Sequence, residues 1–208
     1  MKNSVENPRK TGRPLSFDRD VVLKKAMLTF WRYGYETTSI SDLTAAMGVT
    51  APSIYTAFGD KKRLFLEAMQ LYAGSPEDLE RSLGDAETAR DAVFTMLISA
   101  AEAFTGKDTP RGCLLASATA SGSKDSAEVQ QAVAQVRHRI ANQLRKRIEH
   151  DVEVGILPRD TQASTLADLS IALIQGMSVL ARDGAQRKAL TVMIDMAMSA
   201  WPDNANSR

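Results

Sequence analysis

Residues 37–65 read TTSISDLTAAMGVTAPSIYTAFGDKKRLF, and this stretch decides the fold of the chain. Ser39, followed three positions later by Asp42, carries the capping-box signature of a helix start. Gly48 suits the end of that helix, because glycine adopts the left-handed conformation at little steric cost. The pattern therefore predicts a short helix that ends at Met47.

A second short helix is predicted directly after a tight turn. Thr50 is its expected N-cap, and Pro52 is tolerated in the first turn, where backbone N–H groups have no intrahelical partner. Ile54 and Phe58, four positions apart, give this helix a single apolar face. Val49 is expected to be buried in the turn. Two short helices around a turn that contains glycine follow the helix-turn-helix plan.

A third helix is predicted to begin with three cations, Lys61, Lys62 and Arg63. The helix dipole leaves partial positive charge at a helix N-terminus, so cations in the first turn lower the stability of the helix. An anion held there would reverse this effect, because free N–H groups and cations would converge on it. The chemistry favours a DNA phosphate as that anion.

Two parts of this region, GYETTS at Gly34–Ser39 and IYTAFGDK at Ile54–Lys61, are similar to the TetR family of transcriptional regulators. The resemblance covers roughly residues 13–66, and it is specific because Tyr55 and the lysine lie at the family's positions. It implies an all-α fold. An N-terminal three-helix helix-turn-helix DNA-binding domain would precede a C-terminal helical ligand-binding and dimerisation domain.

The resemblance and the sequence pattern divide the chain into four expected segments. They are a flexible basic arm at 1–15, a helix-turn-helix DNA-binding domain at 16–62, a helical effector-binding and dimerisation domain at 63–202, and a disordered tail at 203–208. Residues 1–63 hold 11 Lys or Arg against 6 Asp or Glu, a net charge of +5. Residues 64–208 hold 15 against 19, a net charge of −4, which together make the chain's +1. A basic N-terminal part is typical of nucleic-acid binding, and a merely well-solvated surface is the alternative.

Another helix is expected before this stretch. It should begin near Asp18, with Ser16 or Asp18 as its cap, and end at Gly34. The polar, proline-containing arm before it carries the basic residues Arg9, Lys10 and Arg13. We expect these three side chains to enter the minor groove, as basic arms do beside helix-turn-helix domains. A solvated tail is the alternative.

The side chains of the helix-turn-helix fall into two groups by their chemistry. The expected phosphate partners are Tyr55 and Lys61, at positions that contact phosphate in the family, and Thr38 and Thr50, at helix N-termini. The residues that remain to contact base edges are Ala51, Pro52, Ser53 and Thr56. None of these four carries the Arg, Asn or Gln side chain that makes bidentate base contacts. We therefore predict that specificity depends on thymine methyl groups, one or two hydroxyl bonds, water, DNA shape and the arm.

Composition is that of an ordinary soluble globular protein, with 208 residues, 44% hydrophobic and 25% charged. A single cysteine excludes an intrachain disulfide framework and suits a reducing cytoplasm. The polar first 20 residues do not resemble a signal peptide. The longest apolar region, Leu166–Ala181, is interrupted by polar residues and is therefore not expected to span a membrane.

The rest of the chain is predicted to be helical throughout, with helices at 60–73, 77–83, 87–105, 113–122, 125–154, 161–182 and 185–201. The last two are apolar around most of their circumference, so each must be buried on two sides. The family's dimers join two such helices from each chain in a four-helix bundle. We therefore expect a homodimer through 161–182 and 185–201, with a near-palindromic operator as its DNA partner. A sandwich within one chain is the alternative.

An effector pocket is implied by the resemblance, because family members bind a small ligand among the C-terminal helices. The candidate lining residues are Phe94, Ile98, Phe104, Leu114, Ser117, Val136 and Met177. Plain core packing is the alternative for each of them. Few charges lie among these residues, which favours a neutral or aromatic effector.

Cys113 is a further effector-site candidate. It follows Pro110–Gly112 and is expected to begin a helix, with Arg111 two positions before it. A helix N-terminus and a nearby cation both lower the pKa of a thiol, which suggests an electrophile or oxidant sensor. The alternative is a small buried hydrophobic residue.

The sequence predicts no catalytic site, no metal site and no cofactor, since it lacks the metalloprotease, nucleophile-elbow and phosphate-loop motifs. The expected function is a repressor whose affinity for its operator falls when a small molecule binds. Three alternatives remain: a helical-bundle enzyme, a DNA-packaging protein, and a ligand-binding protein that no longer binds DNA.

Overall fold

The computed structural model describes residues 17–118 and 126–202, and every regular element in those ranges is an α-helix. The helices are α1 Arg19–Tyr33, α2 Ile40–Met47, α3 Ala51–Phe58, α4 Lys61–Ala73, α5 Pro76–Asp85, α6 Ala89–Phe104, α7 Leu114–Ser117, α8 Ala127–Glu153, α9 Ala163–Arg182 and α10 Arg187–Ser199. The expectations for the arm, for Ser16 as a cap and for the tail 203–208 concern residues outside the described ranges.

The predicted helix boundaries are confirmed to within two residues, apart from the helix expected at 113–122. In the described part of that segment only α7, four residues long, is helical, and the chain turns at Ala118. Residues 119–122 lie outside the described ranges.

Side-chain caps fix the ends of the first three helices, as the sequence indicates. The carboxylate of Asp18 accepts from the N–H groups of Asp20 and Val21, and Gly34 ends α1. Ser39 and Asp42 form the complete capping box of α2.

The turn between α2 and α3 is also close to the prediction. Gly48 ends α2 at φ 72° in the left-handed region, and the hydroxyl of Thr50 accepts from the N–H of Ser53 at 3.4 Å. Val49 is only half-buried, which corrects the expectation that it would be buried in the turn. It still packs against the core, but a turn this short leaves one side of its residues open to solvent.

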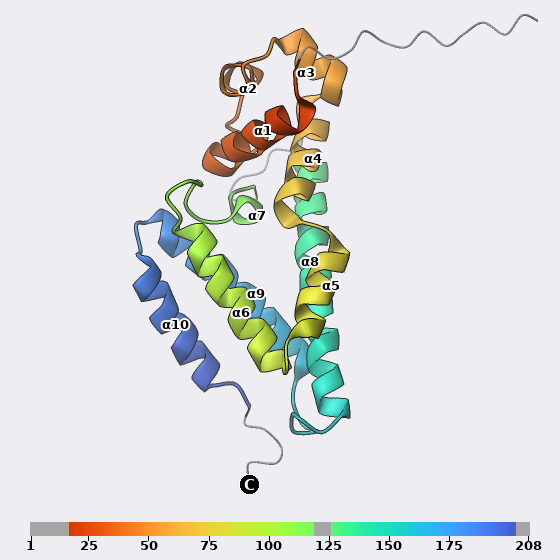
Figure 1. Ribbon diagram of the computed structural model, residues 1–208, viewed down its shortest axis with the longest axis vertical. Helices are drawn as coiled ribbons and strands as arrows, with labels where there is room; N and C mark the ends of the chain where they lie inside the picture. Colours follow the sequence, from red (N-terminus) through yellow and green to blue (C-terminus); the bar gives the residue numbers. More distant parts are fainter. Residues whose placement is uncertain (1–16, 119–125, 203–208) are drawn as a thin grey trace, which may run out of the picture.

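We call α1–α3 with the first turns of α4 the head. Its core is built around Phe30 and Phe65, whose rings meet edge to face with centroids 5.2 Å apart, and Tyr35 packs against both. Leu43 and Ile54 bring α2 and α3 onto the same core. Figure 1 shows the head at one end of the molecule, with α4 leading from it into the remaining helices.

The other helices surround α8, which is 27 residues long. On one side α8 packs against α4 and α5, and on the other it packs against α9, while α6 lies against both α8 and α9 (Figure 1). The outermost helix, α10, packs on α6. The head therefore connects to this layer through α4 and through contacts of α1 and α4 with α7.

One buried ion pair joins the end of α8 to the start of α6. Asp151 is fully buried, pairs with Arg147 and accepts from the N–H of Ala89 at 2.6 Å. The guanidinium of Arg147 also donates to the carbonyls of Leu83 and Ala86, at 3.0 and 3.1 Å. We call this group the α8 clamp. It satisfies the charges and the helix-end groups that it buries, which is the condition for a buried pair to be tolerated.

By length and composition alone, helix α9 is long and apolar enough to cross a membrane, although the polar residues that interrupt Leu166–Ala181 predict no such span. Only 22% of its most apolar 18-residue window is buried within the chain. Poor burial of an apolar helix is equally the mark of a helix that packs against a partner chain.

Candidate nucleic-acid interface

Helix α3 directs a row of small and aromatic side chains away from the core. Its inner face holds Ile54 and Phe58, exposed by 0% and 4%, as their spacing predicts. On the outer side the side chain of Tyr55 is 49% exposed and is available for a contact outside the chain. Of the four predicted base-contact residues, Pro52 and Thr56 are exposed, and Ala51 and Ser53 are half-buried. A single solvent-facing surface of α3 thus carries all five side chains.

The hydroxyl groups on this surface already have partners within the helix. Thr50 and Ser53 share a hydrogen bond of 2.9 Å between their hydroxyls, and Thr56 donates to the carbonyl of Pro52 at 2.8 Å. These side chains therefore expose acceptor lone pairs and methyl groups to solvent. This chemistry suits thymine methyl groups and amino groups of bases better than it suits guanine acceptors.

The predicted role of Thr38 as a phosphate partner is corrected by its position in the structure. Its side chain is 1% exposed, and its hydroxyl donates to the carbonyl of Gly34 at 2.6 Å. Thr38 precedes the N-cap Ser39 and links the end of α1 to the start of α2. A buried hydroxyl in this position stabilises the head and does not reach a phosphate from this conformation.

The three cations of the α4 first turn are accompanied by an acid that the sequence reasoning missed. Asp60 is the N-cap of α4, and its carboxylate accepts from the N–H of Arg63 at 2.7 Å. The signal was present, because an aspartate immediately before a helical segment is a favoured N-cap. Asp60 offsets part of the unfavourable interaction between the cations and the helix dipole.

The side chain of Lys61 packs against the segment between α1 and α2 instead of extending freely into solvent. Its Nζ lies 4.6 Å from the centroid of the Tyr35 ring and 3.4 Å from the carbonyl oxygen of Glu36, to which it donates. Burial lowers the pKa of Lys61, and the charges of Glu36 and Asp42 oppose that shift. The ammonium is thus held between the Tyr35 ring and the Glu36 carbonyl, where it can neutralise an anion with little loss of side-chain freedom.

Lys62 reaches across to a different part of the molecule. Its Nζ forms an ion pair with Glu128 in the first turn of α8, and this hydrogen bond raises the pKa of Lys62. Arg63 lies 4.0 Å from Asp60. Each of the three cations therefore has an acidic or carbonyl oxygen near it in the absence of DNA.

Comparison with known proteins agrees with this geometry at both ends of the chain. The family model described as bacterial regulatory proteins, tetR family, matches residues 22–68. The model described as a tetracyclin repressor-like C-terminal domain matches residues 89–196. The chain belongs to the TetR family of transcriptional regulators.

Relatives of known name support the assignment along nearly the whole length. The HTH-type transcriptional repressor ComR of Escherichia coli strain K12 is 32% identical over 195 residues, which cover 92% of each chain. A cysteine mutant of the TetR family regulator CifR, solved with 26-base-pair operator DNA, superposes with a TM-score of 0.86 at 37% identity. That match covers 91% of this chain and 100% of the CifR chain. Membership of a family of regulators also confirms that the chain is not an enzyme.

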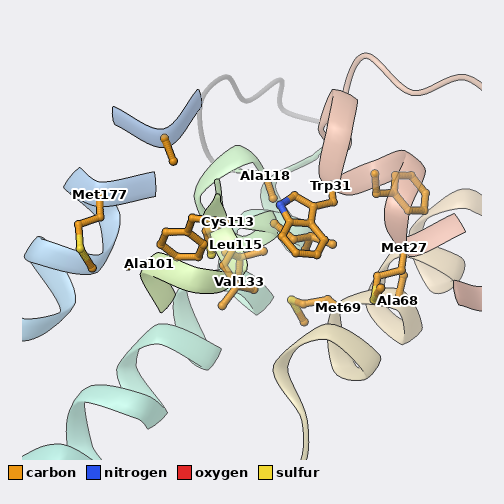
Figure 2. Close-up of a cluster of buried hydrophobic side chains, with 14 of the residues drawn as sticks. Met27, Trp31, Ala68, Met69, Ala101, Cys113, Leu115, Ala118, Val133 and Met177 are labelled. Carbon is orange, nitrogen blue, oxygen red and sulfur yellow. The ribbon is translucent and has the colours of Figure 1, made fainter. Parts of the chain in front are cut away.

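The effector-site candidates of this TetR family chain fall into three groups. Phe104, Cys113, Leu114 and Met177 are buried, and Figure 2 shows Cys113 and Met177 in one cluster of buried side chains that also includes Trp31. Ile98, Ser117 and Val136 are half-buried. Phe94 is 37% exposed, which corrects the expectation that it lines an internal pocket. The spacing of apolar residues cannot show which side of α6 faces the core, because α6 packs against several helices.

Hollows on the described surface between α5 and α8 are lined by other residues. One of about 270 Å³ lies beside Leu83, Gln143 and His150, and a neighbouring hollow lies beside Pro76 and His138. Neither is lined by a residue that the sequence suggested. Among the described residues, no group of three or more His, Cys, Asp or Glu is placed to hold a metal ion.

The surroundings of Cys113 differ from those that the sensor hypothesis assumed. Its side chain is 4% exposed, and the hydroxyl of Tyr72 donates to its Sγ at 3.3 Å. Burial and the neighbouring thiol raise the pKa of Tyr72. Arg111, the expected cation, instead donates to the carbonyls of Ala181 and Ala185 at the end of α9.

Helices α9 and α10 carry large apolar side chains on the surface of the single chain. The exposed members are Leu169, Val179, Leu180, Val192 and Met196, the last of them 74% exposed. Their inner faces are buried through residues such as Met177 and Ile194. Both helices are therefore apolar on two sides, as the sequence predicted.

Proposed function

We propose that this TetR family chain is a homodimeric repressor that binds a near-palindromic operator and releases it when a small molecule binds the C-terminal domain. The observation that carries the proposal is the outer surface of α3, where Tyr55 stands between small base-facing residues and the cationic start of α4. Tyrosine and lysine would contact phosphate and fix the register, while the small side chains approach the bases.

The relatives support repression in particular. ComR and BdcR of Escherichia coli strain K12, which are 32% and 25% identical to this chain, are both named transcriptional repressors. CifR was solved with double-stranded operator DNA. A chain that shares both halves of this architecture is expected to bind its own operator in the same manner.

Dimerisation is supported by the exposed apolar faces of α9 and α10. Contiguous apolar surface on a soluble chain marks an interaction site, and a two-fold dimer would bury the same face of both copies. It would also present two heads to two half-sites about 34–36 Å apart, one turn of B-DNA.

The effector belongs to the same proposal. The buried cluster that contains Phe104, Leu114 and Met177 adjoins half-buried Ile98, Ser117 and Val136, and it is lined by apolar groups. Such a lining suits a neutral or aromatic molecule. A thiol-responsive repressor is the second candidate, favoured by the hydrogen bond that the Tyr72 hydroxyl donates to Sγ of Cys113. Measuring the thiol pKa separates the two, since a value near that of free cysteine removes the case for a sensor.

Selection of DNA from a random library with the purified full-length protein tests the proposal. We expect an inverted repeat with few strongly required G·C pairs under α3, bound about 10³-fold or more tightly than scrambled DNA. Retention of all sequences with equal affinity would indicate a DNA-packaging protein instead. Failure to retain any DNA would indicate a ligand-binding protein.

A further inference from the structure

The carboxyl end of α1 is attached directly to α9, and we call this attachment the α1–α9 joint. It consists of Trp31 on α1, Gly112 and Cys113 in the segment before α7, and Ser178 and Arg182 on α9. Figure 2 shows Trp31 and Cys113 in the same cluster of buried side chains, which also includes Met177. The joint connects the head to a helix of the proposed dimer interface.

On the α1 side the joint satisfies a helix end. The last carbonyls of a helix lack intrahelical partners and carry partial negative charge. The guanidinium of Arg182 donates to the carbonyl of Trp31 at 2.8 Å. Arg182 is 151 residues away in sequence and lies in the last turn of α9. A cation from α9 therefore caps the carboxyl end of α1.

On the other side the segment before α7 is fixed to both helices. The indole Nε1 of Trp31 donates to the carbonyl of Gly112 at 2.8 Å in a buried position. The N–H of Cys113 donates to the hydroxyl of Ser178 at 2.8 Å. Trp31 also packs edge to face on Tyr72, with ring centroids 4.8 Å apart, so a hydrogen bond and a ring contact both hold the indole.

Gly112 shows how closely the parts approach each other. Its φ of +80° lies in the region that favours glycine. A Cβ at this position would lie 2.7 Å from Nε of Arg182 and 2.9 Å from the carbonyl oxygen of Ser178. The space that a side chain would need is occupied by the arginine that caps α1.

We propose that Arg182 is a positioning residue for operator binding, which fixes the direction of the head relative to α9. This inference rests on the proposed function, because it assumes a dimer with two heads. In such a dimer the α9 helices of the two copies define the frame, and each joint sets the angle at which α3 meets the DNA. The preferred spacing of operator half-sites then depends on Arg182, although Arg182 itself does not touch DNA.

The test compares wild-type protein with Arg182→Met on the selected operator and on versions with one or two base pairs added between the half-sites. Wild type is expected to lose affinity steeply when the spacing changes. Arg182→Met is expected to bind the selected operator about tenfold more weakly, because a charged hydrogen bond is lost, yet to lose less affinity on the altered spacings. Arg182→Lys keeps the charge and a donor, so we expect it to restore part of the spacing preference.

Arg81→Met is the matched control. It removes one arginine charge at an exposed pair with Asp78 on α5, away from the joint and from α9 and α10, and is expected to keep the wild-type spacing preference. Sedimentation and thermal melting identify any variant that no longer folds or dimerises. If Arg182→Met does so, the comparison of Arg182→Lys with wild type decides in its place.

A loss of affinity by the same factor on every spacing would overturn the inference, since Arg182 would then only stabilise the fold. Unchanged binding by both Arg182 variants would overturn it as well. The proposed function fails in a different way, when wild-type protein itself shows no preferred operator or spacing.

Discussion

The head and the α9–α10 pair differ in how their helices begin and in how well their apolar side chains are buried. In the head, α1–α4 each begin with a side-chain cap, supplied by Asp18, Ser39, Thr50 and Asp60. Within the described residues, α9 and α10 begin at Gln162 and Gln186 without a side-chain cap hydrogen bond. The head buries the rings of Phe30 and Phe65 in its core, whereas α9 and α10 leave Leu169, Val192 and Met196 exposed.

This difference indicates that local interactions stabilise the head, whereas contacts between distant parts of the chain stabilise α9 and α10. The helix starts of the head are specified locally, by caps within a few residues of each helix. The α9–α10 pair depends on long-range contacts, among them the α1–α9 joint within the chain and a second copy in the proposed dimer. The predictions that follow test this division, from the largest expected effect to the smallest.

The largest effect is expected at the α8 clamp. Asp151→Ala leaves the guanidinium of Arg147 buried without its carboxylate, which should lower the free energy of unfolding by about 3–5 kcal/mol. Chemical denaturation of the dimer measures it. Glu149→Ala is the control, because it removes an exposed partner of Arg145 on the same helix and should cost less than about 1 kcal/mol. Equal losses would show that the clamp has no special role.

The apolar face of α10 is expected to give the next largest effect. Met196→Glu places a charge on a side chain that is 74% exposed in the single chain, so the monomer should remain folded while the dimer dissociates. Operator affinity should then fall by about 100-fold or more, because two heads no longer act together. Sedimentation and titration with operator DNA measure both effects. Val154→Glu, at a 55% exposed position after α8, should leave a dimer.

Lys61→Ala is expected to weaken binding about tenfold, by a similar factor on all DNA sequences. A phosphate contact carries no sequence information, so the salt dependence of binding should become shallower by about one unit. Fluorescence anisotropy at several salt concentrations measures the slope. A slope equal to that of wild type would mean that Lys61 contacts no phosphate.

Ser39→Ala tests the local stability of the head. The variant removes the cap of α2 and should lower the melting temperature by about 2–4 °C. In wild type the hydrogen bonds from the Ser39 side chain and N–H lower the pKa of Asp42. That contribution to stability is present above the unfolded-state pKa of about 3.9 and is lost as the pH falls through the lower folded value. NMR titration should show a higher Asp42 pKa in the variant, and an unchanged value would contradict the capping box.

The smallest effect is expected for Glu128→Gln, which releases Lys62 from its ion pair with α8. The pair is exposed and worth about 0.2–1 kcal/mol, so operator affinity should rise by no more than about fivefold. If Glu128 acts through Lys62, the gain disappears in a Lys62→Met background. Glu149→Gln changes the net charge equally at the other end of α8 and should leave affinity unchanged.

The sequence predicts the head well because its signals are local. Ser39, Gly48 and Thr50 act within four residues of themselves, and the structure confirms the helix boundaries that they imply. The same reasoning was wrong for Thr38 and Val49, whose burial depends on how α1 packs against α2 and α3. Asp60 could have been predicted as a cap from its position.

Outside the head, the sequence predicts which helices are apolar but not which partners they meet. Arg182 and Trp31 are 151 residues apart, and no local pattern connects them. Phe94 belongs to an apolar pattern and still faces outward, since periodicity does not distinguish core from surface on a helix with several neighbours. The effector-site residues, the base contacts and the roles of the arm stay predictions.

Helix α8 can also transmit movement from one end of the molecule to the other. Its ends are held at Glu128 by the cationic turn of the head and at Asp151 by the clamp, 23 residues apart, which corresponds to roughly 35 Å at 1.5 Å per residue. Turning such a rod by about 5° around the clamp moves its far end by roughly 3 Å, which is enough to separate an ion pair. A small rearrangement beside Asp151 would therefore be magnified at Glu128 and at its ion pair with Lys62.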